Sequence, residues 1–525
     1  MRRDVAIIVG LCLALFFLNM GGWDLWNPDE PRYAEVAREM IVLNDYVIPH
    51  LNGEVYTDKP PLFFWLIAGF MYLLGEGSTA AARLPSAIFA TATAILTYFL
   101  GRFLFGWRVG LFSALVLVTN GEFFWLARRA NIDCTLTFFT TLAIVLFWVG
   151  HKRVKGKGLF FSLSFLSMGL GFLAKLQVAV VVPVLALACT LLLLRRFDVF
   201  TNKWLYISSL CFFLPVLSWL VPAYLKGGEE YVISLLYEKT AAIFFKEVSH
   251  PRPFYYYLEN FPLNFLPWFF FFPTALILCI RGRERGHEGI MLILSWFVAS
   301  FLFFSVARGK RELYLLPLYP AASLMVGYLF DRASMDPSLE RRFVRLPAVL
   351  LGGFVFLCGF AVPFLLRARF QLYLERLWGA GFAFSILLCL FGLCLLFLGR
   401  GKRTLYMVTG FTSSGLIISA LLLFPALNPL KSARAMAIEI RRLAGSEERL
   451  AFYEMEGAQF NFYTGFLNVK RLRGEEDLLR YLQDERRPFC LIEKSRLNEL
   501  GSGLSFSVAA FSRIGSKEYL LISGR

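Results

Sequence analysis

Paired acids follow the first apolar run of the chain. Asp29 and Glu30 come a few residues after that run and are followed by Arg32 and Tyr33. A carboxylate at this place could accept a proton from a hydroxyl or orient a neighbouring basic group. Helix capping is the alternative, with Asp29 at the cap and Glu30 in the first turn, but it accounts for one acid only. We take Asp29 as a candidate catalytic residue, and Glu30, Arg32 and Tyr33 as its support.

Two further acids stand beside apolar runs. Asp58 precedes Lys59 and two prolines, and Asp133 opens a run that is otherwise apolar. An acid at membrane depth is costly unless it is paired or functional, so Asp133 is the second candidate catalytic residue. Lys59 could face a phosphate group. The alternatives are a loop ion pair between Asp58 and Lys59, and a helix cap at Asp133.

Basic and aromatic residues near the ends of other apolar runs could complete a phosphate site. Together they would form a basic cluster at the membrane surface. Snorkelling of the basic side chains and interfacial anchoring are the alternatives. His250 is one of four histidines, and with Asp58 it could hold a divalent ion (zinc, magnesium or manganese) if their loops meet. The candidate phosphate ligands of this kind are Arg128, Arg252, Lys310 and Tyr314.

The composition identifies the class of protein. The chain has 525 residues, of which 57% are hydrophobic and 18% charged, and its mean hydropathy is +0.59. Soluble domains carry about 45–50% apolar and about 25% charged residues. This balance excludes a soluble enzyme and a disordered chain, and leaves a polytopic all-α membrane protein. A glycine-rich phosphate loop is missing from the sequence, which argues against a nucleotide-driven pump.

Thirteen apolar runs are near the length needed to cross about 30 Å of hydrocarbon. The 54 Lys and Arg residues outnumber the 38 Asp and Glu residues, and alternate loops are basic. The positive-inside rule then places the N-terminus in the cytoplasm, and an odd number of spans places the C-terminus outside. All the polar stretches named above fall on that outer side. The expected spans are about 5–22, 82–104, 109–126, 132–150, 158–175, 177–194, 204–224, 262–280, 288–306, 313–331, 346–366, 376–398 and 404–424.

The composition changes after Pro425. Residues 1–425 are the expected transmembrane domain, with long outer loops at 21–81 and 226–261. Both loops contain helix-like stretches, which could lie on the membrane surface as amphipathic helices. Residues 426–525 alternate charged helices with short β-like runs, and they predict a small soluble α/β domain.

The combined motifs resemble a known family. They are Trp-x-x-Asp-Glu-x-Arg-Tyr-Ala-Glu, Asp-Lys-Pro-Pro, Asp133, His-x-x-Pro-Phe-Tyr-Tyr-Tyr and Gly-Lys-x-x-x-Tyr-x-x-Pro. This set is similar to the lipid A aminoarabinose transferases, within the protein O-mannosyltransferase superfamily of membrane glycosyltransferases. The likeness covers about residues 5–330. It implies a GT-C fold with thirteen membrane helices, amphipathic helices on the periplasmic surface and a small periplasmic α/β domain.

The resemblance also implies a reaction and its residues. A sugar, aminoarabinose among the candidates, would pass with inversion from undecaprenyl phosphate to an envelope acceptor such as lipid A. The site would face the periplasm of a bacterium from its inner membrane, and the enzyme would act as a monomer without nucleotide or nucleic acid. The family's essential acids fall on Asp29 and Asp133, its phosphate-binding lysine on Lys59 and its phosphate-side tyrosine on Tyr314. Asp58 stands where the family usually has glutamate, which shortens its reach toward His250.

Two other functions fit parts of the pattern. A transferase of the same superfamily could modify a protein, another glycan or another lipid. A transporter or flippase for a lipid-linked substrate would need charged residues and broken helices near mid-membrane, whereas most polar residues here lie at the ends of spans.

Overall fold

The computed structural model describes residues 1–153, 155–238, 251–282, 286–369, 374–483, 488–500 and 505–524. The chain divides into two compact units. The first, called the helical unit, comprises Met1–Met20, Asp58–Phe63 and Pro85–Leu423. The second, called the mixed unit, comprises Gly21–Thr57, Phe64–Leu84 and Phe424–Arg525. The predicted division at residue 425 stays a prediction.

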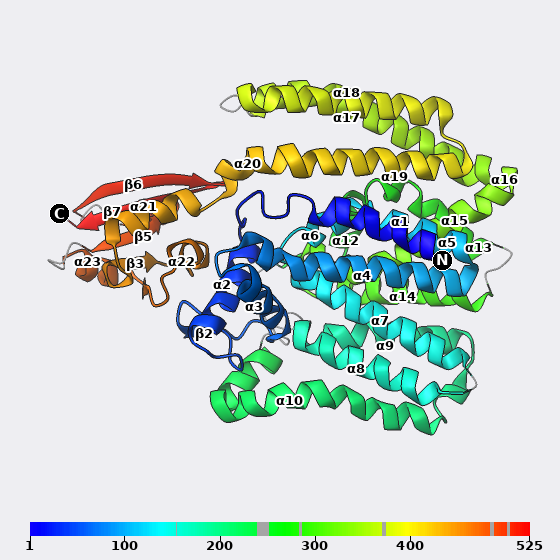
Figure 1. Cartoon of the computed structure of the whole chain (residues 1–525), viewed down its shortest axis with the longest axis horizontal. Helices are drawn as coiled ribbons and strands as arrows, with labels where there is room; N and C mark the ends of the chain where they lie inside the picture. The colour runs from blue at the N-terminus through cyan, green and yellow to red at the C-terminus, as the bar shows by residue number, and fades with distance from the viewer. Residues whose placement is uncertain are drawn as a thin grey trace. The chain divides into compact units, whose positions relative to one another are not determined.

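The helical unit is built from apolar helices joined by short turns. α7, α8 and α9 pack on one another, with α10 against α8 and α14 against α9, while α17 pairs with α18 (Figure 1). The α-helices are α1 (Arg2–Cys12), α4 (Thr79–Phe105), α5 (Trp107–Val118), α6 (Gly121–Ala127), α7 (Ile132–Lys152), α8 (Lys157–Lys175), α9 (Val178–Leu193), α10 (Lys203–Ile233), α12 (Tyr256–Asn264), α13 (Phe272–Arg281), α14 (Glu288–Val306), α15 (Tyr319–Met335), α16 (Pro337–Glu340), α17 (Leu346–Arg369), α18 (Leu374–Leu398) and α19 (Gly401–Ile418). Shorter 3-10 or π segments are η1 (Leu13–Phe17), η2 (Phe197–Val199), η3 (Ser234–Glu238), η4 (Trp268–Phe270), η5 (Glu312–Leu318), η6 (Arg341–Arg345) and η8 (Ser419–Leu423).

The predicted spans all coincide with helices, but fewer than thirteen are long enough to cross a membrane unaided. Within the described ranges, nine helices meet that length and hydropathy, and two bent pairs raise the number to eleven. The runs at about 5–22 and 177–194 fall short, since the first is α1 continued by η1 and the second is the 16-residue α9. The polytopic all-α class is therefore confirmed, with nine to eleven spans by this measure.

Both bends have a local cause. α5 and α6 meet at 68°, where the Asn120 side chain accepts a hydrogen bond from the Phe123 amide and starts a new helix. α12 and the segment that begins at Trp268 meet at 117°, on either side of Pro267, which has no amide hydrogen to donate. A bent pair leaves helix ends and their polar groups inside the bundle.

Small residues let the central helices approach closely. A Cβ atom on Gly101 of α4 would lie 2.8 Å from the Gly110 Cα of α5, and one on Gly327 of α15 would lie 2.2 Å from the Ser113 Oγ of α5. Glycine at these places allows backbone contact of the kind that stabilises helix pairs in lipid.

The mixed unit contains a five-stranded sheet of order β4-β3-β5-β7-β6. β3 is parallel to β4 and β5, whereas β7 is antiparallel to β5 and β6. Alternate residues of the central strands enter two separate apolar clusters, so both faces of the sheet are covered. The small α/β fold predicted for the C-terminal part is confirmed. Its elements are α20 (Phe424–Lys431), α21 (Arg434–Ala444), η9 (Glu447–Arg449), β3 (Leu450–Tyr453), α22 (Ala458–Thr464), β4 (Lys470–Leu472), α23 (Glu475–Leu482), β5 (Phe489–Glu493), α24 (Lys494–Glu499), β6 (Phe506–Ile514) and β7 (Lys517–Gly524).

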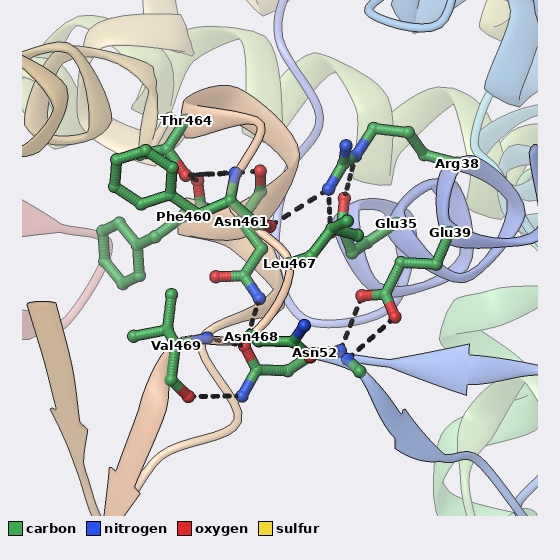
Figure 2. A network of polar contacts seen from close by, with 12 residues as sticks. Glu35, Arg38, Glu39, Asn52, Phe460, Asn461, Thr464, Leu467, Asn468 and Val469 are labelled. Atoms are coloured by element: carbon green, nitrogen blue, oxygen red, sulfur yellow. Dashed lines mark hydrogen bonds and ion pairs between the residues drawn. The ribbon is translucent and has the colours of Figure 1, made fainter. Parts of the chain in front are cut away.

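Most of residues 21–81, the first predicted outer loop, belongs to this same unit. It supplies α2 (Asp29–Val42), the hairpin β1 (His50–Leu51) and β2 (Glu54–Val55), and most of α3 (Leu62–Leu74). Asn52 joins the loop to the C-terminal fold (Figure 2). Its side-chain Nδ2 donates to the Val469 carbonyl at 2.8 Å, and its Oδ1 accepts from the Val469 backbone amide and the Asn461 side chain. Beside it, Glu39 accepts the Asn52 and Gly53 amides at 2.6 and 3.0 Å.

Candidate functional site

A pocket of about 970 Å³ lies within the helical unit. It brings together four predicted site residues from three distant parts of the sequence, Asp58, Lys59, Asp133 and Tyr314. Its polar lining also includes Lys175 and Gln177. The rest of the wall is mainly apolar, from Leu136, Val178, Val181, Phe303 and Phe304. An apolar pocket with a few convergent charged groups is the usual form of a ligand site.

The start of α7 positions Asp133. Asn131 is the N-cap, and its side chain accepts the Asp133 amide at 2.9 Å, so the Asp133 carboxylate is not needed for capping. The Ser86 hydroxyl of α4 hydrogen bonds with the Asn131 backbone amide and carbonyl and fixes the cap. The alternative prediction, that Asp133 is the N-cap of α7, is therefore wrong.

The Asp133 carboxylate pairs with Lys175. The Lys175 Nζ lies 2.5 Å from the Asp133 Oδ1, and both side chains are largely buried, with 13% and 2% exposed. The same Nζ lies 4.3 Å from the centre of the Tyr314 ring, a cation–π distance. Lys175 ends α8, and the positive φ of 52° at Leu176 turns the chain into α9, with the strain that such a φ causes in a non-glycine residue.

Lys175 and Gln177 are polar pocket residues that the sequence did not single out as site residues. Lys175 is a basic residue in a turn between two apolar runs that is predicted to be on the outer side, against the positive-inside rule. This exception to the rule is the feature of the sequence that indicates a functional role for Lys175. The sequence does not indicate that Asp133 is its partner.

The other predicted phosphate ligands do not line this pocket. Arg128 is buried, and its guanidinium donates to the Leu15 and Leu18 carbonyls at 2.5 and 2.6 Å, at the end of the first span. Lys310 donates to the backbone carbonyls of Arg252, at 3.0 Å, and Ala307, and burial lowers its pKa. These contacts stabilise the backbone, and a phosphate role for the three basic residues stays a prediction.

The loop segments that carry Arg252 and Lys310 lie side by side. Pro251 and Gly309 form an isolated antiparallel bridge, and the Arg252 amide donates to the Arg308 carbonyl at 3.2 Å. Gly309 and Ala307 line the pocket, so this bridge holds one edge of it in place.

The paired acids Asp29 and Glu30 lie in the mixed unit. Asp29 begins α2, and the Arg32 guanidinium lies 3.9 Å from its carboxylate. Glu30 is buried and pairs with the Arg83 Nε at 2.7 Å while accepting the Trp26 amide at 3.0 Å. The Tyr33 ring packs 5.9 Å from that of Phe64. Glu30 therefore has a structural role in ordering the entry to α2.

Metal binding stays a prediction. In the part of the chain that the structure describes, no three His, Cys, Asp or Glu side chains are placed to share an ion. His250, the proposed partner of Asp58, lies outside the described residues.

Solved structures place this arrangement in a known fold. The crystal structure of ArnT from Cupriavidus metallidurans bound to undecaprenyl phosphate superposes with a TM-score of 0.82 over 98% of this chain and 97% of that one, at 19% identity. This chain has the ArnT fold. The archaeal oligosaccharyltransferase AglB from Archaeoglobus fulgidus is more distant, with a TM-score of 0.54 over 89% of this chain and 64% of that one, at 13% identity. The predicted GT-C fold is confirmed.

Sequence relatives extend the likeness to ArnT. An undecaprenyl phosphate-alpha-4-amino-4-deoxy-L-arabinose arabinosyl transferase from Edwardsiella ictaluri is 30% identical over 70% of this chain and 66% of its own length. Its counterpart from Pseudomonas aeruginosa PAO1 is 29% identical over 65% and 62%. A family model described as dolichyl-phosphate-mannose-protein mannosyltransferase matches residues 58–221. The predicted resemblance is confirmed, and the chain spans just under two thirds of the length of these curated relatives.

Proposed function

We propose that the chain is a membrane glycosyltransferase that moves a sugar from undecaprenyl phosphate to a cell-envelope acceptor. Aminoarabinose is the first candidate sugar, because the names of the curated relatives contain it. Lipid A is the first candidate acceptor, because the motifs resemble those of the lipid A aminoarabinose transferases. The single observation that carries the proposal is the pocket in which Lys59, Lys175 and Asp133 stand against an apolar wall.

The chemistry of transfer assigns a task to each of these groups. The bond between the anomeric carbon and the phosphate oxygen breaks, and undecaprenyl phosphate leaves with the electron pair. Lys59 and Lys175 would stabilise the negative charge on that phosphate, and each ammonium contributes about 4 kcal/mol at 4 Å and an effective dielectric constant near 20. The acceptor oxygen forms the new bond from the opposite face, which inverts the anomeric centre.

The proton of a hydroxyl acceptor needs a base, and Asp29 is the predicted one. A phosphate acceptor is already an anion near neutral pH and needs no base. Asp133 would then act through Lys175, since it holds that ammonium 2.5 Å away beside Tyr314. A divalent ion, if bound by Asp58 and His250, would supply further charge to the leaving phosphate.

The apolar wall fits the lipid part of the donor. Leu136, Val181, Phe303 and Phe304 come from α7, α9 and α14, three helices of the bundle. A polyprenyl chain in contact with them would leave its phosphate at the lysines. From the basic loops we propose that the pocket lies at the periplasmic face of the inner membrane, with the N-terminus in the cytoplasm and the C-terminus outside. A monomeric enzyme stays a prediction.

A transfer assay tests the function. Purified chain in detergent would be given a panel of undecaprenyl-phosphate sugars, with lipid A, other glycolipids and a Ser/Thr peptide as acceptors. Transfer that Lys59→Ala abolishes without unfolding supports the proposal. Its loss in Asp29→Asn as well would indicate that the acceptor is a hydroxyl group, which needs a base. Movement of undecaprenyl phosphate across vesicles without any transfer would favour a flippase.

A further inference from the structure

A second cavity, here called the polar groove, lies wholly within the mixed unit. It measures about 1040 Å³ and is bordered by residues just before and within α2, by the end of α20, by the start of α22 and by the turn between β6 and β7. None of its lining residues belongs to the pocket of the helical unit. The sugar-transfer proposal leaves this groove without a role.

Basic side chains dominate the polar groove. Arg32, Lys431 and Lys517 line it against one carboxylate, that of Glu456. The Arg32 guanidinium is 3.9 Å from Asp29 and 3.7 Å from Glu456, too far for the paired hydrogen bonds that a guanidinium can give. Lys431 is exposed, and within the described ranges no carboxylate lies within 4.0 Å of it. An anion would therefore find donors that the fold leaves partly unused.

The inner wall of the groove offers an acceptor. Gln459 is 8% exposed, and its Oε1 atom is buried without a hydrogen-bond partner among the residues that the structure describes. A buried acceptor without a donor costs about 1–3 kcal/mol, so a ligand hydroxyl at this atom would be favoured. Tyr519 also lines the groove, and its hydroxyl hydrogen bonds with the Gln459 side chain, which holds the amide of Gln459 in place.

We propose that the polar groove binds a phosphorylated saccharide. Its phosphate would lie between Arg32, Lys431 and Lys517, and a sugar hydroxyl would donate to the Gln459 Oε1. A simple anion would leave Gln459 unsatisfied, and an uncharged sugar would leave the cations unused. The same chemistry occurs in a free sugar phosphate and in the headgroup of a phosphorylated glycolipid. The groove shares Arg32 with the predicted support of Asp29, so the tests below change other lining residues and measure binding instead of sugar transfer.

Binding to the full chain tests the site. The protein in phosphatidylcholine nanodiscs would be titrated with glucosamine 1-phosphate, glucosamine and inorganic phosphate, each followed by calorimetry. We expect the sugar phosphate to bind at least tenfold more tightly than either of the others. Equal affinity for inorganic phosphate, or for glucosamine, would overturn the proposal.

The chain offers a matched control for the lysine variants. Lys517 pairs with Glu493 at 2.7 Å, and Lys494 pairs with Glu518 at 2.8 Å, but only Lys517 lines the groove. Lys431→Ala and Lys517→Ala should each weaken sugar-phosphate binding about tenfold, the loss of one charge-assisted contact. Lys494→Ala should leave it unchanged, and an equal loss in this variant would show non-specific attraction and refute the site.

A separate variant tests whether the groove recognises the sugar part of the ligand. Gln459→Leu keeps the volume but removes the acceptor, so it should remove the preference for sugar phosphate over inorganic phosphate. The melting temperature shows whether the variant remains folded after losing the hydrogen bond to Tyr519. An unchanged preference in this folded variant would contradict the assignment of Gln459. Nanodiscs that contain a phosphorylated glycolipid then distinguish the two possible ligands. If the glycolipid competes with glucosamine 1-phosphate, the groove accepts a lipid headgroup. If it does not compete, the ligand is a free sugar phosphate.

Discussion

The buried pair of Asp133 and Lys175 makes the sharpest prediction, because its two roles can be separated. Lys175→Met removes the ammonium and leaves a carboxylate that is 2% exposed. Removal of one partner of a buried ion pair costs about 3–5 kcal/mol of stability, chiefly from the unpaired charge that remains. The double variant Lys175→Met/Asp133→Asn contains no such charge, and the Asn131 cap survives because it binds the backbone of residue 133. Most of the lost stability should return in the double variant.

The rate of sugar transfer should not recover in the double variant, although its stability does. If Lys175 stabilises the leaving phosphate, its loss should lower the transfer rate about 10²–10³-fold in the single and the double variant alike, as for other electrostatic stabilisers. The assays are melting temperature in detergent and initial rate of sugar transfer at saturating donor. Lys152→Met is the matched control, since it breaks the lysine–carboxylate pair with Glu288 in the same unit, where the side chains are 31% and 35% exposed. That change should cost at most about 1 kcal/mol and leave transfer intact.

Recovery of both stability and transfer in the double variant would refute the reasoning. The pair would then serve only to hold α7 against α8, and the leaving phosphate would depend on other groups.

Three further outcomes are expected. Lys59→Ala should weaken undecaprenyl-phosphate binding about tenfold, measured as a Kd in detergent, whereas the exposed Lys203→Ala should not; equal effects would remove Lys59 from the site. Arg83→Met should lower the melting temperature strongly, because it leaves Glu30 buried and unpaired at a cost of about 3–5 kcal/mol, and a shift of less than about 1 °C would contradict that burial. Burial and the nearby Glu35 raise the pKa of Glu39 from its ordinary value of 4.5 to about 8. The stability that protonated Glu39 contributes is therefore present in full below pH 4.5 and lost as pH rises through 8. Melting temperature between pH 5 and 9 should show this fall, and Glu39→Gln should flatten it; an unchanged slope would assign the pH dependence to another group.

Local patterns were enough to predict much of the fold. Apolar run length located the helices, and the alternation after Pro425 indicated the α/β part, because both signals lie within one element. The bend at Asn120 was not predicted, because the run from 109 to 126 is apolar on both sides of this residue. That bend depends on one side-chain cap, which hydropathy does not register.

The site was predictable in its residues but not in its partners. Asp133 stood out because an acid is rare in an apolar run, and the pocket does contain it. Its pairing with Lys175 links residues 42 apart, and the joining of Asn52 to Asn461 links residues 409 apart. Such contacts follow from packing of whole elements, which sequence spacing does not specify.

The central claim, that the pocket of the helical unit holds the lipid-linked donor, can be tested by cross-linking. Undecaprenyl phosphate with a diazirine on its first isoprene unit would be photolysed with the purified chain, and the labelled peptides identified by mass spectrometry. We predict labels on α7, α9 and α14, near Leu136, Val181 and Phe304, and their loss with excess unlabelled lipid. The helical unit offers a second apolar cavity, of about 760 Å³, lined by Phe354, Phe391 and other residues of α17, α18 and α19. Labels confined to that cavity would contradict the account.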